Sequence, residues 1–360
     1  MFYDTLQILT EQGFTVKTDI IADKLLYLVH AVLPSINWTK ENAIYRSSIW
    51  DEDGNPVSLS FKKFVNWGER PDIFPPPTSL NHTNIISKVD GSCLVISKFR
   101  DTLILRTRGT FNALTQVNGQ ELLWLQERYP LVFNNKLLNS EKYSILCEWT
   151  TPSNKIVIDY GNQPDLKLLN IIQHKEYRYL SQKEVDECAA LWSIKRPERY
   201  TYHSVSQMLT DVPTWVGKEG ICLYYNNDQD ILKVKSLDYL RKHAFKSNIT
   251  QKNIVELFMS WDRPNKDSML KRIETEYDFE CRKMSEECIN TLYLKKDQID
   301  HIINDVTAVV SPLKMDTRKN AAFDIVRRYK DNGLTGIAFT LLDGKPISDN
   351  DYKKLLLKES

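Results

Sequence analysis

Short apolar and β-branched runs separated by turns make up most of the chain as far as about residue 245. Residues of these types favour strands, and short strands joined by turns are typical of antiparallel sheets. The pattern therefore predicts antiparallel sheets, flanked by helices, in this first part of the chain. The clearest runs cover residues 92–97, 102–107, 145–149, 155–160 and 220–225.

Beyond residue 245 the pattern changes to one that indicates helices. Thr250 has the side chain of an N-cap for an apolar segment that Pro264 ends, and a charged and apolar pattern then covers residues 266–294. Helical hairpins are the simplest structure for this pattern. We therefore predict an α+β protein with a sheet-containing domain at 1–245 and an all-helical domain at 246–360.

A lysine with the surroundings of a nucleophile lies between two strand-like runs. Lys88 opens a K-x-D-G-S segment with Asp90 and Gly91. Attack on a phosphorus atom requires a neutral amine, and free lysine titrates at about 10.4, so the site must lower the lysine pKa through cations, burial or a metal. Asp90 can orient the amine or hold water and metal. Gly91 lets the backbone pass close to a ligand because it has no Cβ.

Four charged residues that suit a nucleotide follow in three segments along the chain. A strand-like run ends at Glu148, and Glu219 opens an E-G-I segment. Lys233 and Lys235 flank Val234, and the period of two along a strand places both ammonium groups on one face, as a triphosphate requires. Taken singly, the glutamates could be strand-end carboxylates, and the lysines could protect an exposed sheet edge.

The order of these segments resembles that of the nucleotidyltransferase superfamily of polynucleotide ligases and mRNA capping enzymes. Upstream of the nucleophile, Arg46 and a K-F-x-N segment that begins at Lys63 resemble the phage RNA ligase 1 family. Arg106 and Arg108 replace lysines of that family's basic segment, which keeps the charge but changes the hydrogen-bond geometry. The resemblance covers about residues 46–239.

The resemblance implies roles for these residues. Lys88 would be the catalytic nucleophile, and Glu219 would hold a divalent metal. Lys233 and Lys235 would neutralise the α-phosphate and lower the pKa of Lys88. The implied nucleotide-binding residues are Arg46, Lys63, Asp90, Gly91, Arg108, Glu148, Lys233 and Lys235.

Some of the implied roles are more specific. Arg46 and Lys63 would hold the β- and γ-phosphates, and Glu148 would accept a hydrogen bond from a ribose hydroxyl. Arg106 and Tyr239 are candidate contacts for RNA or nucleotide. Without the resemblance, Arg106 would be an exposed strand charge and Tyr239 a packing residue.

The same resemblance implies an ATP-dependent RNA ligase. Such an enzyme uses ATP and Mg²⁺, for which Mn²⁺ can substitute, and joins 5′-phosphate and 3′-hydroxyl RNA ends through a lysyl-adenylate and an adenylylated RNA. The helical second domain resembles the phage RNA ligase 1 architecture, which implies nicked tRNA as a substrate. An end-healing kinase or phosphatase would then be a partner. ATP rather than GTP is implied by the family alone.

Two alternatives remain open. DNA ligases and capping guanylyltransferases share the motifs, but they usually continue with a β-barrel, which would need short strands where this chain indicates helices. The other alternative is a catalytically inactive RNA-binding relative. The presence of Lys88, Glu148, Glu219, Lys233 and Lys235 argues against it, because a binding module has no chemical need for all five.

Composition adds little to this picture. The 360 residues are 42% hydrophobic and 26% charged, as in ordinary globular proteins. The net charge of +1 gives no overall attraction to nucleic acid, so an RNA surface must be a local patch. One basic stretch is either a phosphate-contacting patch or a solvated helix face. Its residues are Lys314, Arg318, Lys319, Arg327, Arg328 and Lys330.

The sequence also carries signals about the compartment. No apolar run is long enough for a membrane span, and the N-terminus does not have the pattern of a signal peptide. The six cysteines include no C-x-x-C pair, which favours reduced thiols. We therefore expect no membrane association and a cytoplasmic location, in a phage-infected bacterial host if the resemblance holds.

Overall fold

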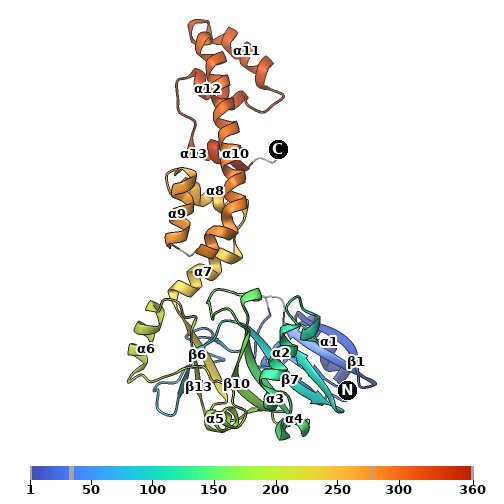
Figure 1. Ribbon diagram of the computed structural model, residues 1–360. Coiled ribbons are helices and arrows are strands. Elements are labelled where there is room, and N and C mark those ends of the chain that lie inside the picture. Colours follow the sequence, from blue (N-terminus) through green and yellow to red (C-terminus); the bar gives the residue numbers. More distant parts are fainter. Residues whose placement is uncertain (1, 32–35, 277–278, 358–360) are drawn as a thin grey trace. The chain divides into compact units, whose positions relative to one another are not determined.

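The computed structural model describes residues 2–31, 36–276 and 279–357. By its internal contacts the chain divides into two compact units, Met1–Leu240 and Arg241–Ser360 (Figure 1). The first unit contains the sheets, and the second is built from helices in the residues that are described. The predicted α+β class, with antiparallel sheets followed by an all-helical part, is therefore confirmed.

Three sheets form the first unit in the described residues. The first has the order β1 (Phe14–Ile21), β2 (Lys24–Ala31), β3 (Ser47–Trp50) and β4 (Pro56–Leu59). The second has the order β11 (Arg178–Tyr179), β10 (Asp165–Gln173), β9 (Tyr143–Thr150), β7 (Ser92–Phe99) and β8 (Thr102–Arg106). The third has the order β12 (Arg199–Tyr200), β6 (Asn84–Lys88), β13 (Gly220–Tyr225), β14 (Asp230–Lys235) and β5 (Val65–Asn66). Neighbouring strands are antiparallel except β14 and β5, which are parallel.

Helices cover the outer face of the second sheet, and α1 (Phe2–Glu11) packs against β1. Leu122, Val132 and Val185 come from three of these covering helices and share one apolar cluster with Leu94 and Ile145 of the sheet. The remaining helices of the first unit are α2 (Glu121–Arg128), α3 (Pro130–Phe133), α4 (Lys136–Asn139), α5 (Gln182–Leu191) and α6 (Val205–Asp211). Burial of these apolar faces is the main stabilising term for such layers.

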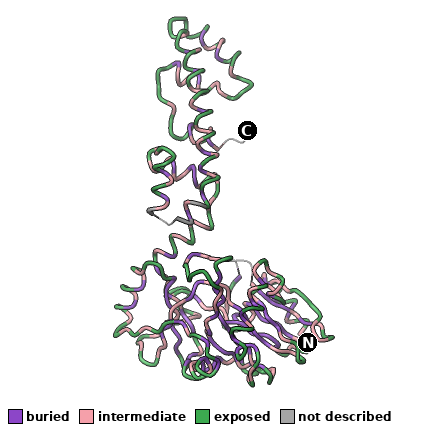
Figure 2. The backbone as a smooth tube through the Cα atoms, in the orientation of Figure 1, coloured by how far each residue is buried: buried purple, intermediate pink, exposed green. Residues whose placement is uncertain are grey.

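A second apolar cluster joins the three sheets to one another. It contains Val29 of the first sheet, Val95 and Leu146 of the second, and Ile86 and Tyr224 of the third. Figure 2 shows buried residues concentrated along the strands of this unit. Because β6 belongs to the third sheet and β7 to the second, the short segment between them links two sheets at this core. That segment is the predicted nucleophile segment.

The second unit is helical in all its described secondary structure. Ile254, Phe258, Ile289 and Leu292 lie in its larger core. Thr250 caps the helix Gln251–Ser260, since its Oγ1 accepts a hydrogen bond from the backbone N–H of Asn253 at 3.2 Å. The elements are α7 (Leu237–Ser247), which begins in the first unit, α8 (Gln251–Ser260), α9 (Lys266–Glu276), α10 (Phe279–Val310), α11 (Arg318–Tyr329), α12 (Thr335–Leu342) and α13 (Asp349–Leu357). No helix in the described ranges is long and apolar enough to cross a membrane.

Candidate active site

Lys88 lies at the end of β6, where three neighbouring strands bring the candidate charges together. Gly220 is paired with Lys88 on one side and with Lys235 on the other. The preceding residue, Glu219, is 2% exposed and lies between the two ammonium groups. Its carboxylate oxygens are 3.0 Å from Lys88 Nζ and 2.8 Å from Lys235 Nζ. The strand register therefore places a nucleophile, an acid and a cation in one contact group.

The glycine at position 220 is required by this close packing. Its φ is +145°, and a Cβ at this position would lie 2.0 Å from the carbonyl oxygen of Val234. Only glycine fits such a conformation and such an approach. The E-G pair of the sequence thus combines a buried charge with the one residue that allows its strand to pair closely on both sides.

The charge of Lys88 in this arrangement differs from our expectation. Burial by itself lowers the pKa of the Lys88 ammonium, but the carboxylate of Glu219, with smaller contributions from Cys222 and Glu148, raises it above its ordinary value. We expected the site, through cations such as Lys233 and Lys235, to bring this pKa below its ordinary value, and the net shift is upward instead. The reason is that Glu219 is in direct contact with the amine.

Glu148 is the second buried carboxyl group near Lys88. It is 7% exposed, and its Oε1 accepts a hydrogen bond from the backbone N–H of Gly91 at 3.0 Å. Burial raises the pKa of Glu148 to about 7, although the positive charge of Lys88 opposes this. A Cβ on Gly91 would lie 2.5 Å from the carbonyl oxygen of Trp149. The absent Cβ therefore permits contact with strand β9, and the contact of Gly91 with a nucleotide stays a prediction.

Asp90 is held entirely by protein groups. It is 4% exposed, and its Oδ2 accepts hydrogen bonds from the backbone N–H groups of Val157 at 2.8 Å and Ile158 at 2.9 Å. Its Oδ1 accepts one from the Tyr239 hydroxyl at 2.8 Å. We had expected Asp90 to orient the amine or bind nucleotide and metal, and these contacts give it a structural role instead. Carboxylates that accept several such bonds fix the surrounding loop.

The contacts of Asp90 also explain an error in the predicted strands. Residues 155–160 form a loop and bends, not a strand. Their backbone N–H groups at Val157 and Ile158 bond to the Asp90 side chain, so they are not available to a neighbouring strand. Tyr160 in the same loop accepts a hydrogen bond on its hydroxyl from the Asp90 backbone N–H at 2.9 Å.

Tyr239 is buried, and the structure gives it a positioning role. It is 3% exposed, and Lys235 Nζ lies 4.7 Å from its ring centroid. Together with its bond to Asp90, this contact links Lys235 to the nucleophile segment. The sequence made Tyr239 a candidate RNA or nucleotide contact, but its buried ring and hydroxyl are both used inside the protein.

Two of the cations expected to bind phosphates lie on the ring of Phe64, and a third lies on the ring of Trp38. Arg46 lies 5.2 Å and Lys233 Nζ 5.4 Å from the centroid of the Phe64 ring. Lys63 Nζ lies 5.2 Å from the ring centroid of Trp38. Burial, and then the charges of four neighbouring cations, lowers the pKa of Lys233 to about 8. These cations are Lys235, Arg46, Lys88 and Lys63. Such a concentration of positive charge suits a polyanion.

Arg108 and Arg106, two residues apart on the chain, have opposite environments. Arg108 is exposed. Burial lowers the pKa of Arg46, and the charge of Arg108 lowers it further. Burial also lowers the pKa of Lys63, to which the charges of Arg46 and Arg108 both contribute. Arg106 is fully buried. Its guanidinium donates to the side chains and carbonyl groups of Ser47 and Ser58 at 2.7 to 3.1 Å. The expectation of a nucleotide or RNA contact is therefore wrong for Arg106, because the alternation of the strand turns it inward.

Two aromatic groups of the site were missed at the level of the sequence. Phe64 carries Arg46 and Lys233 on its ring, and Tyr160 lies under Lys167 Nζ at 4.7 Å. Phe64 stands inside the K-F-x-N segment, so the motif contained the signal. Tyr160 could not be found in this way, because it reaches the site from an irregular loop.

The carboxylates suit a metal that is held partly by a substrate. In the described residues no group of three or more His, Cys, Asp or Glu side chains could hold an ion. Mg²⁺ usually keeps several waters and binds through one or two carboxylates together with substrate phosphates. Glu219 is close enough to Glu148 for its charge to contribute to the raised pKa of Glu148. These two oxygen donors fit such a site.

The predicted basic stretch is exposed but partly neutralised. Arg318 forms an ion pair with Asp343 at 2.7 Å, and Arg327 forms one with Asp324 at 3.5 Å. The stretch lies on α11 and the short turn before it, in the second unit. Both the phosphate-contacting patch and the solvated helix face are compatible with these contacts.

Comparison with known proteins identifies the family. Residues 46–287 match the model of a family described as RNA ligase, of the phage RNA ligase 1 type. The match spans well over half of the 360 residues. The chain therefore belongs to this RNA ligase family and is an enzyme of that class, as its motifs indicated. No curated protein matches the sequence significantly.

Several solved structures are similar at low sequence identity. A putative ATP-dependent DNA ligase from Aquifex aeolicus has 14% identity and a TM-score of 0.48, over 96% of this chain and 100% of that one. An archaeal ATP-dependent RNA ligase has 13% identity and a TM-score of 0.46, over 96% of both chains. A Naegleria gruberi RNA ligase crystallised with PPi has 17% identity and a TM-score of 0.34, over 45% of this chain. The present chain spans about half of that protein, at 51%.

Proposed function

We propose that this RNA ligase uses ATP and Mg²⁺, with Mn²⁺ as a substitute, to join a 5′-phosphate RNA end to a 3′-hydroxyl RNA end. The observation that carries the proposal is the contact of Glu219 with both Lys88 and Lys235, at 3.0 and 2.8 Å, beside the cations around Phe64. This arrangement holds an amine next to a site for phosphates. Charge complementarity of this kind is the main requirement for phosphoryl transfer.

In the first step, the Lys88 amine attacks the α-phosphorus of ATP. A bond forms between nitrogen and phosphorus, the bond to the β-phosphate oxygen breaks, pyrophosphate leaves and the amine loses its proton. Arg46, Lys63 and Arg108 hold the departing phosphates, and Lys233 and Lys235 neutralise the α-phosphate. When Lys235 turns to the phosphate, it leaves its contact with Glu219.

Glu219 links the protonation of the nucleophile to occupancy of the site. Its carboxylate keeps the Lys88 pKa raised in the protein without nucleotide. A Mg²⁺ ion bound at Glu219 would supply charge neutralisation at this carboxylate and at the phosphates. Lys88 would then become a neutral nucleophile only in the filled site. Glu148 accepts the ribose hydroxyl hydrogen bond, beside the Gly91 N–H that it already accepts.

The second and third steps return the enzyme to its starting state. An oxygen of the RNA 5′-phosphate attacks the AMP phosphorus, the phosphorus–nitrogen bond breaks, and Lys88 regains a proton. A 3′-hydroxyl oxygen then attacks the activated RNA phosphorus and loses its proton, while AMP leaves. The products are a phosphodiester bond and a restored lysine.

The biological setting is also part of the proposal. We assign adenylyl transfer to residues 1–245 and RNA selection to the helical residues 246–360, with nicked tRNA as the substrate. The exposed basic residues of α11 supply charge for phosphate contacts in that domain. An end-healing kinase or phosphatase would provide suitable ends, and the cytoplasm of a phage-infected bacterium is the expected location.

Incubation with ATP or GTP that carries a radioactive α-phosphate, in the presence of Mg²⁺, tests the proposal. We expect label from ATP on the denatured polypeptide, none on Lys88→Ala, and an unchanged amount on Lys136→Ala. Lys136 is a matched control because it is exposed on α4, with no ion pair in the described part of the chain. Stronger labelling from GTP would instead favour a capping-type guanylyltransferase. The absence of label from both nucleotides, with folded protein that is free of bound AMP, would favour an inactive RNA-binding relative.

If the enzyme becomes labelled, a second experiment must show whether its substrate is RNA or DNA. Nicked RNA and nicked DNA of the same sequence, each with 5′-phosphate and 3′-hydroxyl ends, should be offered in parallel. Sealing of RNA supports the proposal, and preferential sealing of DNA would favour the DNA ligase alternative.

A further inference from the structure

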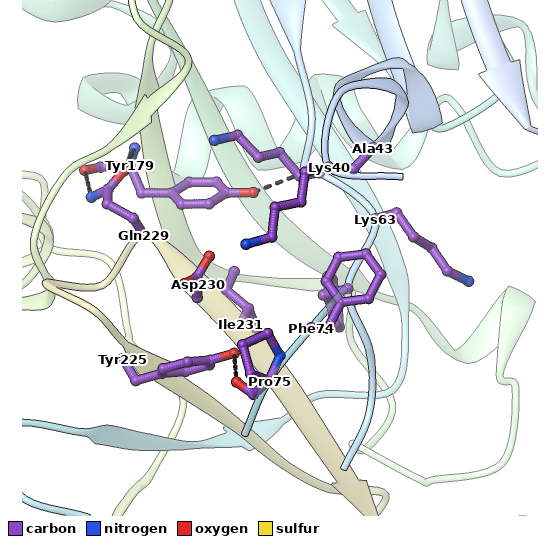
Figure 3. Close-up of a pocket in the computed structure, with 12 residues that line it drawn as sticks. Lys40, Ala43, Lys63, Phe74, Pro75, Tyr179, Tyr225, Gln229, Asp230 and Ile231 are labelled. Carbon is purple, nitrogen blue, oxygen red and sulfur yellow. Dashed lines mark hydrogen bonds between the residues drawn. The ribbon is translucent and has the colours of Figure 1, made fainter. Parts of the chain in front are cut away.

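A pocket lies next to the cations around Phe64. Its volume is about 170 Å³, and residues from the K-F-x-N segment, the 3₁₀ helix before β3, strand β14 and the loop after β5 line it (Figure 3). Of its lining residues, only Lys63 and Phe64 belong to the phosphate site proposed above, and the others have no role there. Its position is therefore adjacent to the proposed triphosphate site.

The pocket carries an excess of positive charge. Lys62 Nζ lies 5.2 Å from the ring centroid of Tyr177 and 5.5 Å from that of Tyr179, and in the described ranges it has no ion pair. Burial lowers the pKa of Lys62, and the charge of Asp230 opposes this only partly. Lys40, which is exposed, also lines the pocket (Figure 3). Lys40 and Lys62 thus line a pocket whose lining contains one carboxylate, that of Asp230.

The single carboxylate is already engaged. Asp230 Oδ2 accepts a hydrogen bond from the Asn226 amide at 2.5 Å. Among the residues that the structure describes, neither Lys40 nor Lys62 forms an ion pair with it. The two ammonium groups are therefore available for an anionic ligand.

The walls of the pocket are aromatic. Phe64, Phe74 and Tyr225 line it, and the Tyr225 hydroxyl donates to the carbonyl oxygen of Pro75 at 2.9 Å, which fixes that ring. Aromatic rings beside cations are the usual means by which proteins bind single-stranded RNA, since bases stack on the rings and phosphates contact the cations. A bare phosphate or pyrophosphate would not need such walls.

The geometry of the reaction decides which nucleotide reaches this pocket. Attacking and leaving groups lie roughly in line in phosphoryl transfer. Pyrophosphate leaves opposite Lys88 in the first step. Lys88 is the leaving group in the second step, so the RNA 5′-phosphate must approach from the side that pyrophosphate has vacated. That side is formed by Arg46 and Lys63, and Lys63 also borders the pocket, from which its side chain extends away (Figure 3).

We propose that the pocket of Lys40, Lys62, Phe64, Phe74 and Tyr225 binds the 5′-terminal nucleotide of the RNA strand that receives AMP. The base lies between the aromatic walls, and the backbone phosphate contacts the two lysines. This inference rests on the proposed function, because it takes the position of the 5′-phosphate from the in-line requirement. It adds a site for the donor strand that adjoins the nucleotide site and shares the Phe64 ring with it.

The kinetic test separates the two steps of the reaction. The variants are Lys40→Glu, which changes an exposed side chain, and Lys40→Glu combined with Lys62→Gln, with Lys136→Glu as the control of equal charge change. Purified lysyl-adenylate enzyme is mixed with a 5′-phosphorylated single-stranded RNA in a single turnover. We expect AMP transfer at low RNA concentration to fall by about tenfold or more in the pocket variants, as for loss of a charge-assisted contact. Lysyl-adenylate formation from ATP should change by less than about twofold.

The outcomes distinguish the inference from the proposed function. Unchanged AMP transfer in both pocket variants, with normal lysyl-adenylate formation, overturns the pocket inference alone. Loss of lysyl-adenylate formation in these variants, or weaker inhibition by pyrophosphate, would assign the pocket to the triphosphate tail and also overturn it. The absence of lysyl-adenylate in the unaltered protein would refute the proposed function itself. Thermal melting controls for folding of each variant.

A direct measurement locates the nucleotide. The same RNA is made with 4-thiouridine at its 5′ end and is irradiated on the lysyl-adenylate enzyme, and the cross-linked peptide is sequenced by mass spectrometry. We expect the cross-link in the peptide of Phe74 or of Tyr225, and a weaker cross-link in Phe74→Ala. Cross-links confined to peptides outside the pocket would overturn the inference even if the lysine variants were defective.

Discussion

Replacement of Glu219 by glutamine tests how the site controls its nucleophile. Glutamine has nearly the same shape, so the pairing of Gly220 with its two neighbouring strands should persist. The change removes the negative charge that lies 3.0 Å from Lys88 Nζ and 2.8 Å from Lys235 Nζ. The ammonium groups of Lys88 and Lys235 then lose the negative charge that both of them contact. We expect the pKa of Lys88 to fall.

The size of this effect can be bounded by Coulomb's law. At the 3.0 Å separation, the attraction is about 1.4 kcal/mol with the dielectric constant of water and about 5.5 kcal/mol with an effective value of about 20. Lys88 is 22% exposed and Glu219 is 2% exposed, so the true value lies between these limits. One pKa unit corresponds to about 1.4 kcal/mol. The pKa of Lys88 should therefore fall by roughly one to four units in Glu219→Gln.

Competitive labelling measures this pKa directly. The protein is treated briefly with trace acetic anhydride over a range from neutral to strongly alkaline pH, and mass spectrometry quantifies acetylation of the Lys88 peptide. Only the neutral amine reacts, so the midpoint of the pH profile reports the pKa. In Glu219→Gln the midpoint should move to lower pH. At the same time lysyl-adenylate formation with Mg²⁺ should fall sharply, because the proposed metal ligand is lost.

The control is a glutamate that pairs with a lysine at the surface. Glu198 lies 3.1 Å from Lys218 Nζ, but both side chains are well exposed, so Glu198→Gln should leave the Lys88 profile unchanged. An unchanged or higher Lys88 midpoint in Glu219→Gln would refute the argument. It would mean that burial and the neighbouring cations, and not Glu219, set the charge of the nucleophile.

Three further predictions follow from the geometry. Affinity for a nonhydrolysable ATP analogue, measured by calorimetry, should weaken about tenfold as the pH rises through about 8. The reason is that the pKa of Lys233 is lowered to about 8, so that this side chain loses its charge there. Lys233→Arg should remove the pH dependence, because arginine keeps its charge. Arg106→Ala should lower the free energy of unfolding in urea by about 2–4 kcal/mol, because it leaves buried serine and carbonyl oxygens without donors. Replacement of the exposed Arg108 by alanine should change this free energy by less than about 0.5 kcal/mol. Equal effects of the two changes would contradict the buried contacts. Gly220→Ala should lower the melting temperature strongly, because the added Cβ would lie 2.0 Å from a carbonyl oxygen. Gly336→Ala, at an open helical position, should leave the melting temperature unchanged or raise it. A Gly220→Ala variant with an unchanged melting temperature would refute the close packing.

Much of the site could be predicted from local sequence. The period of two placed Lys233 and Lys235 on one strand face, and the strand that carries them is present. Thr250 caps its helix as expected, since a cap depends only on neighbouring residues. The K-x-D-G segment indicated Lys88 by its composition. These features depend on contacts within a few residues, and such contacts can be recognised without knowledge of the fold.

Other features depended on partners far away in the chain. Asp90 was expected to act on the substrate, but its acceptors are filled by Val157, Ile158 and Tyr239. The same bonds convert an apolar run that favours a strand into a loop. Arg106 has the residue type of a phosphate contact, yet it points into the core. A polar side chain is assigned by what surrounds it, and these surroundings come from distant segments.

The sequence by itself determined the class of protein, because the charged residues needed for nucleotidyl transfer stand in a fixed order with recognisable neighbours. It also indicated that helices follow the strands, because the hydrophobic period changes near residue 245, although the structure already begins α7 at Leu237. Only the tertiary structure decided that Glu219 joins Lys88 to Lys235, and that Lys40 and Lys62 face an aromatic pocket. The physical reason is that distances between charges, and the exclusion of water around them, arise when separate strands and loops pack together.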